Sequence, residues 1–180
     1  KAALIPMGSD INGGFLPMPS EGGHSAFPFR EGREQEFNRF LIKRLGVSYP
    51  SIDNVVTGGG MALLHEFLTG NPITPHQVPE HLEEGSETLL WGARFLARVA
   101  RDFALDTLST GGLFIAGGVA ARSPALVRHE AFGAEFRDSQ KHAGLLERIP
   151  VSLITDEASG LWGAAMRGIE QLKRPGLYEG

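Results

Sequence analysis

The segment Glu21-Gly22-Gly23-His24 carries the clearest candidate chemistry in this sequence. Two glycines separate a carboxylate from an imidazole, and paired glycines can adopt backbone angles that are closed to other residues, so the chain can turn tightly and bring both polar groups together. An ionised Glu offers only acceptors, which suit neighbouring hydroxyls of a polyol, while a His can donate or accept at a third hydroxyl. The pattern favours a sugar-binding turn, and the plain alternative is an exposed turn without a ligand.

A second candidate lies in the segment 113–119, where a short apolar run ends in Gly117 and Gly118. Because glycines have no side chains, a flat ligand such as a nucleotide base or a ribose can lie against the backbone and use its N–H groups. In open α/β sheets, ligands usually bind at the carboxyl ends of strands, which is where this pair falls. The alternative is that the glycines only let a helix pack close to the sheet.

Weaker candidates are the run Thr57-Gly58-Gly59-Gly60, which could form an anion-binding nest, and Asp53 just before it. The run lacks the lysine and the spacing of a P-loop, and a lone carboxylate is usually a surface residue. The histidines show no metal-ligand spacing, and neither a nucleophile elbow nor an H-E-x-x-H motif occurs in the sequence. The sequence therefore predicts no metal site and no covalent nucleophile.

Composition sets further limits on the function. The 180 residues fit one domain, and with a net charge of −4 and scattered basic residues nothing suggests a nucleic-acid or anionic membrane partner. The absence of cysteine excludes disulfides and thiolate zinc sites, and it is consistent with a reducing cytoplasm. No apolar run approaches the roughly 20 residues that cross a bilayer.

The elements that must position these candidates alternate between strands and helices, which predicts an α/β fold. Short apolar runs on both sides of Asn12-Gly13 are typical of a β-hairpin. Apolar spacing and capping residues predict helices, and two later apolar runs predict strands, with the longest helix as the spine and Trp91 and Trp162 in the core. The expected helices are 34–45, 61–68, 86–108, 125–137 and 160–172, and the expected later strands are 113–116 and 151–155.

Four segments in order resemble the larger, C-terminal domain of bacterial glucokinase, a member of the actin-like sugar kinase superfamily. They are 16–24, 55–60, 111–119, and 149–154 together with 160–164. The resemblance implies that residues 1–180 form an actin-like ATPase (ribonuclease H-like) large domain, with a central sheet flanked by helices. It also implies that the small N-terminal domain, the phosphate loops and the catalytic aspartate precede Lys1. Since the chain has no cysteine, it is similar to the zinc-free members.

At the matching positions, the resemblance implies that Glu21 and His24 hydrogen-bond hydroxyls of glucose. Asp53 stands where the family has a glutamate that also touches the sugar, and whether the shorter side chain reaches the same hydroxyls stays open. Gly117 and Gly118 belong to the family's adenosine-binding region. The implied reaction is glycolytic: ATP, with Mg²⁺, phosphorylates glucose to glucose 6-phosphate. No catalytic residue of that reaction and no metal ligand is expected in this chain.

The piece alone is expected to be inactive and to bind glucose and ATP weakly, because it holds only half of the cleft. Two alternatives on the same fold stay open, a sugar-responsive transcriptional regulator and a non-catalytic partner domain. The family often pairs through this domain, so a homodimer is a further expectation that the sequence leaves open.

Overall fold

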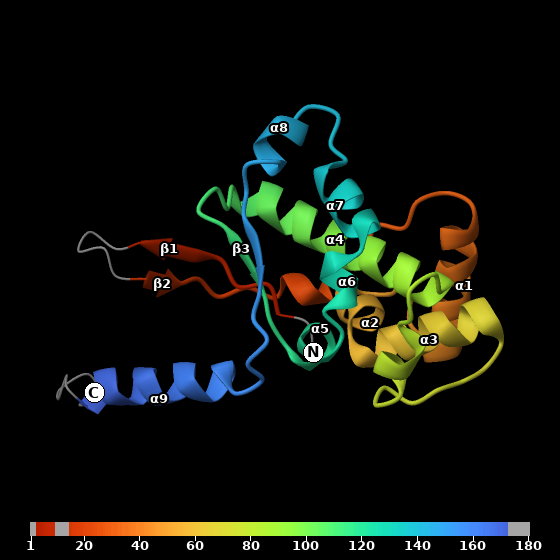
Figure 1. The fold of residues 1–180 in the computed structure, drawn as a ribbon, viewed down its shortest axis with the longest axis horizontal. Coiled ribbons are helices and arrows are strands. Elements are labelled where there is room, and N and C mark those ends of the chain that lie inside the picture. Colours follow the sequence, from red (N-terminus) through yellow and green to blue (C-terminus); the bar gives the residue numbers. More distant parts are fainter. Residues whose placement is uncertain (1–2, 10–14, 173–180) are drawn as a thin grey trace.

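The computed structural model describes residues 3–9 and 15–172 as an α/β structure in which helices dominate and strands are short (Figure 1). The strands are β1 (Met7–Ser9), β2 (Phe15–Pro17), β3 (Leu113–Ile115) and β4 (Val151–Leu153). The α-helices are α1 (Arg33–Leu45), α2 (Ile52–Val56), α3 (Gly58–Thr69), α4 (Glu87–Thr107), α5 (Gly118–Arg122), α6 (Ala125–Arg128), α7 (Glu130–Arg137), α8 (Ala143–Leu146) and α9 (Ser159–Leu172). Two 3₁₀ turns, η1 (Gly22–His24) and η2 (Val78–His81), complete the list. None of the helices in these ranges is long and apolar enough to cross a membrane.

The strands pair in two separate sheets. β1 and β2 form the predicted antiparallel hairpin, with Met7 opposite Pro17, while the predicted Asn12-Gly13 turn lies outside the described residues. β3 and β4 pair in parallel. Where the sequence predicts one central sheet, the strands of the described ranges thus form two sheets of two strands each. Each strand has only three residues, and Phe114 on β3 is 70% exposed, so the β3–β4 pair is not covered on that side.

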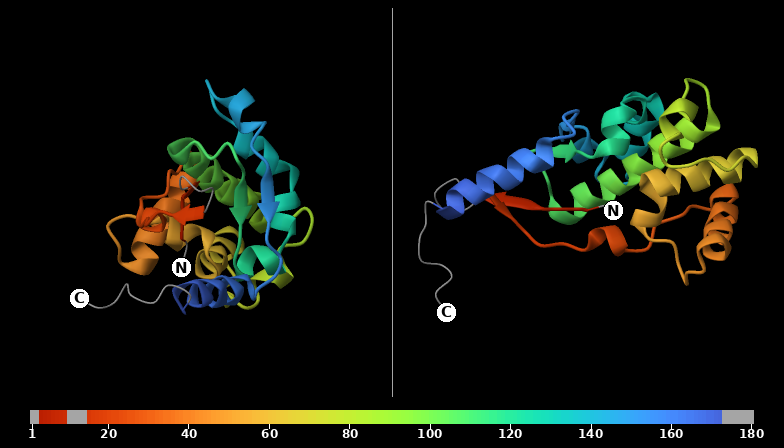
Figure 2. Two further views of the ribbon diagram at one scale, coloured as in Figure 1. Left: turned by 90° about the vertical axis from the view of Figure 1, so that its left-hand side faces the viewer. Right: turned by 90° about the horizontal axis from the view of Figure 1, so that it is seen from below.

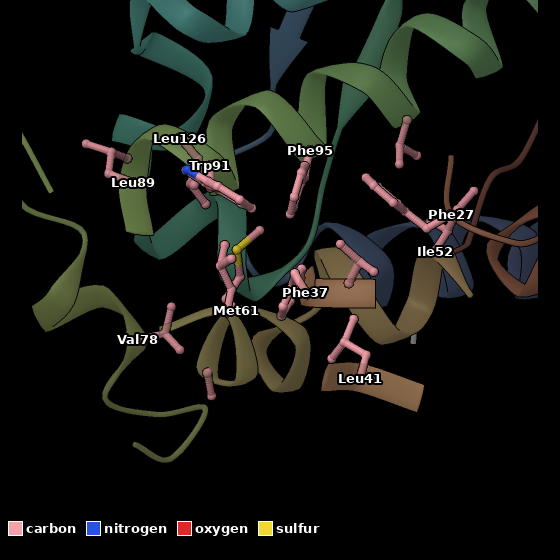
Figure 3. Packing of buried hydrophobic residues seen from close by; sticks show 14 of the residues in the cluster. Phe27, Phe37, Leu41, Ile52, Met61, Val78, Leu89, Trp91, Phe95 and Leu126 are labelled. Atoms are coloured by element: carbon pink, nitrogen blue, oxygen red, sulfur yellow. The ribbon is translucent and has the colours of Figure 1, made fainter. Parts of the chain in front are cut away.

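Helix α4 is the spine of the domain, as predicted, and crosses it between α7 on one side and α3 and α2 on the other (Figure 1). It begins at the cap Ser86, whose side-chain oxygen accepts a hydrogen bond from the N–H of Leu89 at 3.1 Å. One stretch of its surface packs on a cluster from α1, α2, α3 and α6 (Figure 3). Buried members of that cluster include Phe37, Leu41, Met61, Leu64, Phe95 and Leu126.

A second cluster forms on the other stretch of α4, where its buried side chains are small. Ala93, Ala97, Ala100 and Ala104 follow one another at helical spacing and contact the region of α7 and α8. Because alanine has only a methyl group, α7 can approach closely, and this is the most extensive helix–helix contact of the domain. The two clusters make α4 a rigid support for the segments that surround it.

Helix predictions were accurate where a long apolar period was present. α1, α4 and α9 lie within one residue of their predicted bounds, and Gly46 ends α1 in the left-handed conformation. The single helix predicted for 125–137 is wrong, because His129 is extended (ψ 137°) and its Nδ1 caps α7 by accepting from the N–H of Ala131. The short helices α2, α5 and α8 were not predicted, because an apolar helical period cannot be recognised over four or five residues.

The two tryptophans differ in burial. Trp91 is 8% exposed and packs in the first cluster, as predicted. Trp162 is 66% exposed, so its predicted core position is wrong. It lies on α9, which extends from the same side of the helical body as the β1–β2 hairpin (Figure 2). The apolar side chains of α9 therefore do not pack into either described cluster.

Candidate functional site

The structure brings the two polar side chains of the Glu21–His24 turn together. Glu21 precedes η1, and the carbonyl of Glu21 accepts a hydrogen bond from the N–H of His24 at 2.9 Å. As a result, Glu21 Oε2 lies 3.4 Å from His24 Nε2. The side chains are 89% and 56% exposed, so a ligand can reach both of them from solvent. An acceptor and an imidazole thus share one accessible spot, as hydroxyl recognition requires.

Neither glycine of this turn has a left-handed backbone, and Gly22 lies in a confined space. Gly22 lies outside the left-handed region, contrary to the reason given for it from the sequence. A Cβ added to Gly22 would lie 3.1 Å from Leu4 Cδ1 and 3.3 Å from Ser20 Oγ. The N–H of Gly22 also donates to Ser20 Oγ at 3.1 Å. A side chain at this position would thus contact Leu4 and Ser20 more tightly than usual, and these two side chains would have to shift by a few tenths of an ångström.

Asp53 is placed beside this turn by backbone pairing. The N–H of Ile52 donates to the carbonyl of Ser25 at 2.9 Å, and Ala26 and Ser51 form an isolated antiparallel bridge. Asp53 therefore directly follows a residue that is bonded to the neighbour of His24. It belongs to α2, which is fixed by a reciprocal cap between Ser51 and Asn54. The three predicted sugar-binding residues thus come from two segments that are joined by backbone hydrogen bonds.

Gly117 and Gly118 present an open stretch of backbone. Gly117 has φ 111°, which other residues rarely adopt, and Gly118 begins α5. Among the described residues, no atom lies within 4 Å of a Cβ added at either position. The alternative raised from the sequence, that these glycines serve close helix packing, therefore does not describe them. They leave room for a flat ligand against the chain.

The second glycine run meets this region from the side. Gly58, the first residue of α3, lies against Val119 of α5 and the loop residue Pro75. A cavity of about 50 Å³ lies between this loop and α5, with Gly118 in its wall. A wider hollow of about 420 Å³ lies over α7, but no predicted site residue borders it. The small cavity adjoins the predicted adenosine segment, and the large one does not.

Two buried polar groups near these segments were not predicted. Arg98 on α4 is 1% exposed and binds Glu34 and Glu135. His65 on α3 is 7% exposed, with its Nδ1 3.0 Å from Thr88 Oγ1. Burial lowers the pKa of His65 from 6.5, and the nearby His81 lowers it further. For Arg98, the only signal in the sequence was a charged residue at a core-facing position of α4. That signal does not identify Glu34 and Glu135 as its partners.

The described residues gather no set of three His, Asp or Glu side chains that could hold a metal ion.

Comparison with known proteins identifies the family of this chain. The sequence profile of the glucokinase family matches residues 5–171. The chain is 33% identical over 160 residues to a glucokinase of Caulobacter sp. (strain K31), covering 83% of this chain and 48% of that protein. It is 29% identical over 182 residues to a glucokinase of Nitrobacter hamburgensis, covering 94% and 54%. The chain thus spans about half the length of the curated relatives it matches.

Solved structures give the same result for the fold. A glucokinase from an Antarctic psychrotroph is similar with a TM-score of 0.68 and 25% identity, covering 84% of this chain and 50% of that one. A glucokinase from Balamuthia mandrillaris, solved in complex with glucose, has a TM-score of 0.70 at 18% identity, covering 81% and 45%. The profile match across nearly the whole sequence establishes that this chain belongs to the glucokinase family.

Proposed function

We propose that this chain is the C-terminal, actin-like large domain of a glucokinase that transfers the γ-phosphoryl group of ATP to glucose. The observation that carries the proposal is the approach of Glu21 Oε2 to His24 Nε2 at 3.4 Å on an accessible surface. Asp53 lies on the segment that pairs with this turn. The complex of the Balamuthia mandrillaris relative with glucose supports the same sugar for this family member.

In this proposal, the sugar half of the site orients glucose. The carboxylate of Glu21 accepts hydrogen bonds from two neighbouring hydroxyls, and His24 bonds a third. Asp53, one methylene shorter than the family's glutamate, completes the contacts from the side of α2. Because phosphoryl transfer needs in-line geometry more than covalent help, this orientation is the chain's main contribution to the rate.

The nucleotide half lies at Gly117 and Gly118. The open backbone at these positions supports binding of the adenosine of ATP, since no atom of the described residues lies within 4 Å of a Cβ added at either glycine. The strand β3 ends just before them, which is the usual position of a ligand in α/β proteins. Mg²⁺ would enter with the phosphates of ATP, and we assign it no ligand in this chain.

A coupled assay on the whole protein tests the function. With glucose and MgATP, we expect glucose 6-phosphate to form, and mannose and fructose serve as competing hexoses. ADP and polyphosphate in place of ATP test the donor. A whole protein that carries the family's catalytic aspartate but forms no glucose 6-phosphate would overturn the proposal and favour a sugar-responsive regulator or a non-catalytic partner.

The isolated 180-residue chain provides a second test. We expect no kinase activity, because the residues assigned here only bind and orient, and no general base for the sugar hydroxyl is among them. Titration calorimetry should detect weak glucose binding at most. Phosphorylation of glucose by this chain alone would contradict the division of roles.

A further inference from the structure

A buried ionic network joins α4 to the segment that follows the sugar turn. Arg98 is 1% exposed, and its guanidinium binds both carboxylate oxygens of Glu34, at 2.6 and 3.0 Å. Its Nε donates to Glu135 Oε1 at 2.8 Å. Arginine is almost never buried so completely unless its charge is paired, and here two carboxylates pair it. The network accordingly has a fixed geometry.

The same guanidinium also grips the chain just after the turn. Arg98 Nη1 donates to the carbonyl of Pro28 at 3.0 Å. The carbon of the guanidinium lies 5.7 Å from the ring centre of Phe27, a distance typical of a cation–π contact. Glu34, held by Arg98, accepts in turn from the N–H of Arg30 at 2.7 Å. Arg98 thus contacts Phe27 and Pro28 directly and Arg30 through Glu34.

On its other side, this segment is hydrogen-bonded to the residues that precede α2. The N–H of Phe27 donates to the carbonyl of Pro50 at 2.9 Å, next to the Ala26–Ser51 bridge. Phe27 and Ile52 lie at the same end of the core cluster in Figure 3. The segment is therefore held between α4 and the residues that lead into α2. His24 lies three residues before Phe27, and Asp53 lies three residues after Pro50.

Stability alone does not require this arrangement. A buried ion pair gains little over apolar side chains of similar volume, because its desolvation cost offsets its attraction. What the network does provide is direction, since a guanidinium bonds in fixed directions and one side chain here reaches four acceptor atoms. The network thus fixes where the segment 27–30 lies on α4.

We propose that Arg98 is a positioning residue of the sugar site, which holds the Glu21–His24 turn in register with Asp53 through Pro28 and Phe27. The proposal rests on the proposed function for its link to glucose. It assigns Arg98 no contact with the substrate or the nucleotide. The positioning acts on the sugar half only, since every bond of Arg98 goes to α1, α7 or the segment after the turn.

The test uses Arg98→Lys in the whole protein. A lysine keeps the charge but cannot reach Pro28, Glu34 and Glu135 together. We expect faster hydrogen–deuterium exchange at the amides of Phe27, Phe29 and Arg30. We also expect kcat/KM for glucose to fall about 10- to 100-fold with the KM for ATP unchanged, as displaced orienting groups cause.

Arg101→Lys is the matched control. Arg101 lies one turn further along α4, donates to the carbonyls of Glu135 and Asp138, and pairs with Glu135 Oε1 at 3.5 Å. It therefore shares Glu135 with Arg98, but its contacts outside α4 go to α7 and Asp138 and not to the segment 27–30. We expect a similar loss of thermal stability, with faster exchange confined to 130–138 and kcat/KM for glucose unchanged. Equal effects of both variants on glucose would contradict a specific role of Arg98.

A triple variant, Arg98→Met with Glu34→Leu and Glu135→Leu, covers the case in which the lysine variant does not fold. Removing the three charges together leaves no unpaired charge among Arg98, Glu34 and Glu135. Arg30 and Arg101 also lose Glu135 but keep Asp138 and Asp102 as partners, and Arg94 is 35% exposed, so we expect a folded protein. Exchange at Phe27 should still be fast, because Pro28 has lost its donor. A triple variant with native exchange in 24–30 would overturn the proposal. A wild-type protein without glucose phosphorylation would overturn only the proposed function, since exchange still reports on Arg98.

Discussion

Gly58 and Val119 lie so close that a Cβ on Gly58 would stand 3.5 Å from Val119 Cγ2. Gly58 begins α3 directly after Thr57, whose side-chain hydroxyl donates to the carbonyl of Asp53 at 2.7 Å. Val119 directly follows Gly118. The candidate sugar residue Asp53 and the candidate adenosine residue Gly118 are therefore connected by one short run of contacts, which gives the two halves of the site a common frame.

The carboxylate of Glu21 is expected to carry much of the sugar affinity. Glu21→Ala removes charge-assisted hydrogen bonds that contribute about 1.5–3 kcal/mol, so the KM for glucose of the whole protein should rise about 10- to 100-fold. Steady-state kinetics measure the change. Glu31→Ala, an exposed carboxylate ten residues later, is the control and should leave the KM unchanged. A normal glucose KM in the Glu21 variant would remove this residue from the site.

The packing of the turn predicts an effect of Gly22→Ala. The added methyl would lie 3.1 Å from Leu4 Cδ1 and 3.3 Å from Ser20 Oγ, so these side chains must shift by a few tenths of an ångström. We expect a loss of about 1–3 kcal/mol in the free energy of unfolding and a raised glucose KM. Gly144→Ala, where no atom lies within 4 Å of the new methyl, is the control. Unchanged melting and kinetics for both variants would show that the contact with Leu4 has no effect.

The open backbone at Gly118 predicts a selective loss of nucleotide affinity. Gly118→Ala needs no left-handed backbone and meets no atom within 4 Å, so the protein should fold normally. The methyl would occupy the space proposed for adenosine, so the KM for ATP should rise several-fold while the KM for glucose holds. Calorimetric titration with ATP measures the same change. Unaltered ATP binding would place the adenosine elsewhere.

Glu34 predicts a loss of stability in acid. Burial raises the pKa of Glu34, but the hydrogen bonds from Arg98 and from the N–H of Arg30 outweigh it and bring the pKa below 4.5. The ionised form therefore stabilises the fold above pH 4.5, and this stabilisation is lost as the pH falls through the lowered pKa. Glu34→Gln should be less stable at neutral pH but should depend less on pH in acid.

The measurement is denaturant unfolding at several pH values on either side of this range. The control is Glu36→Gln, which makes the same substitution at an exposed glutamate of the same helix and should keep the wild-type pH profile of stability. A Glu34→Gln profile parallel to that of the wild type would show that the network does not titrate as described.

His65 predicts a second loss of stability at a higher pH. Its pKa lies below 6.5, so the folded protein keeps the imidazole neutral while the unfolded chain takes up a proton. Stability is therefore full above pH 6.5 and falls as the pH drops through the lowered pKa. His65→Gln should abolish this part of the profile, and the exposed His142→Gln should not. A wild-type stability that stays flat below pH 6.5 would contradict the assignment.

The sequence alone determined most of the long elements and the adjacent polar groups of the Glu21–His24 turn. The helices α1, α4 and α9 follow from apolar spacing over three or more turns, and Gly46 and Ser86 mark their ends. The Glu21–His24 turn could be predicted because both polar groups and their glycines are adjacent in the chain. Local steric and capping effects act over a few residues, so they can be read from neighbouring letters.

Only the tertiary structure decided the rest. The pairing of Ser25 with Ile52, the reach of Arg98 to Pro28 across 70 residues, and the contact between Gly58 and Val119 join segments that are distant in the chain. The packing of Leu4 against Gly22 gave that glycine a different purpose from the one its conformational freedom suggests. Such contacts depend on how helices settle on one another, and their energies come from burial and geometry that no local pattern of residues contains.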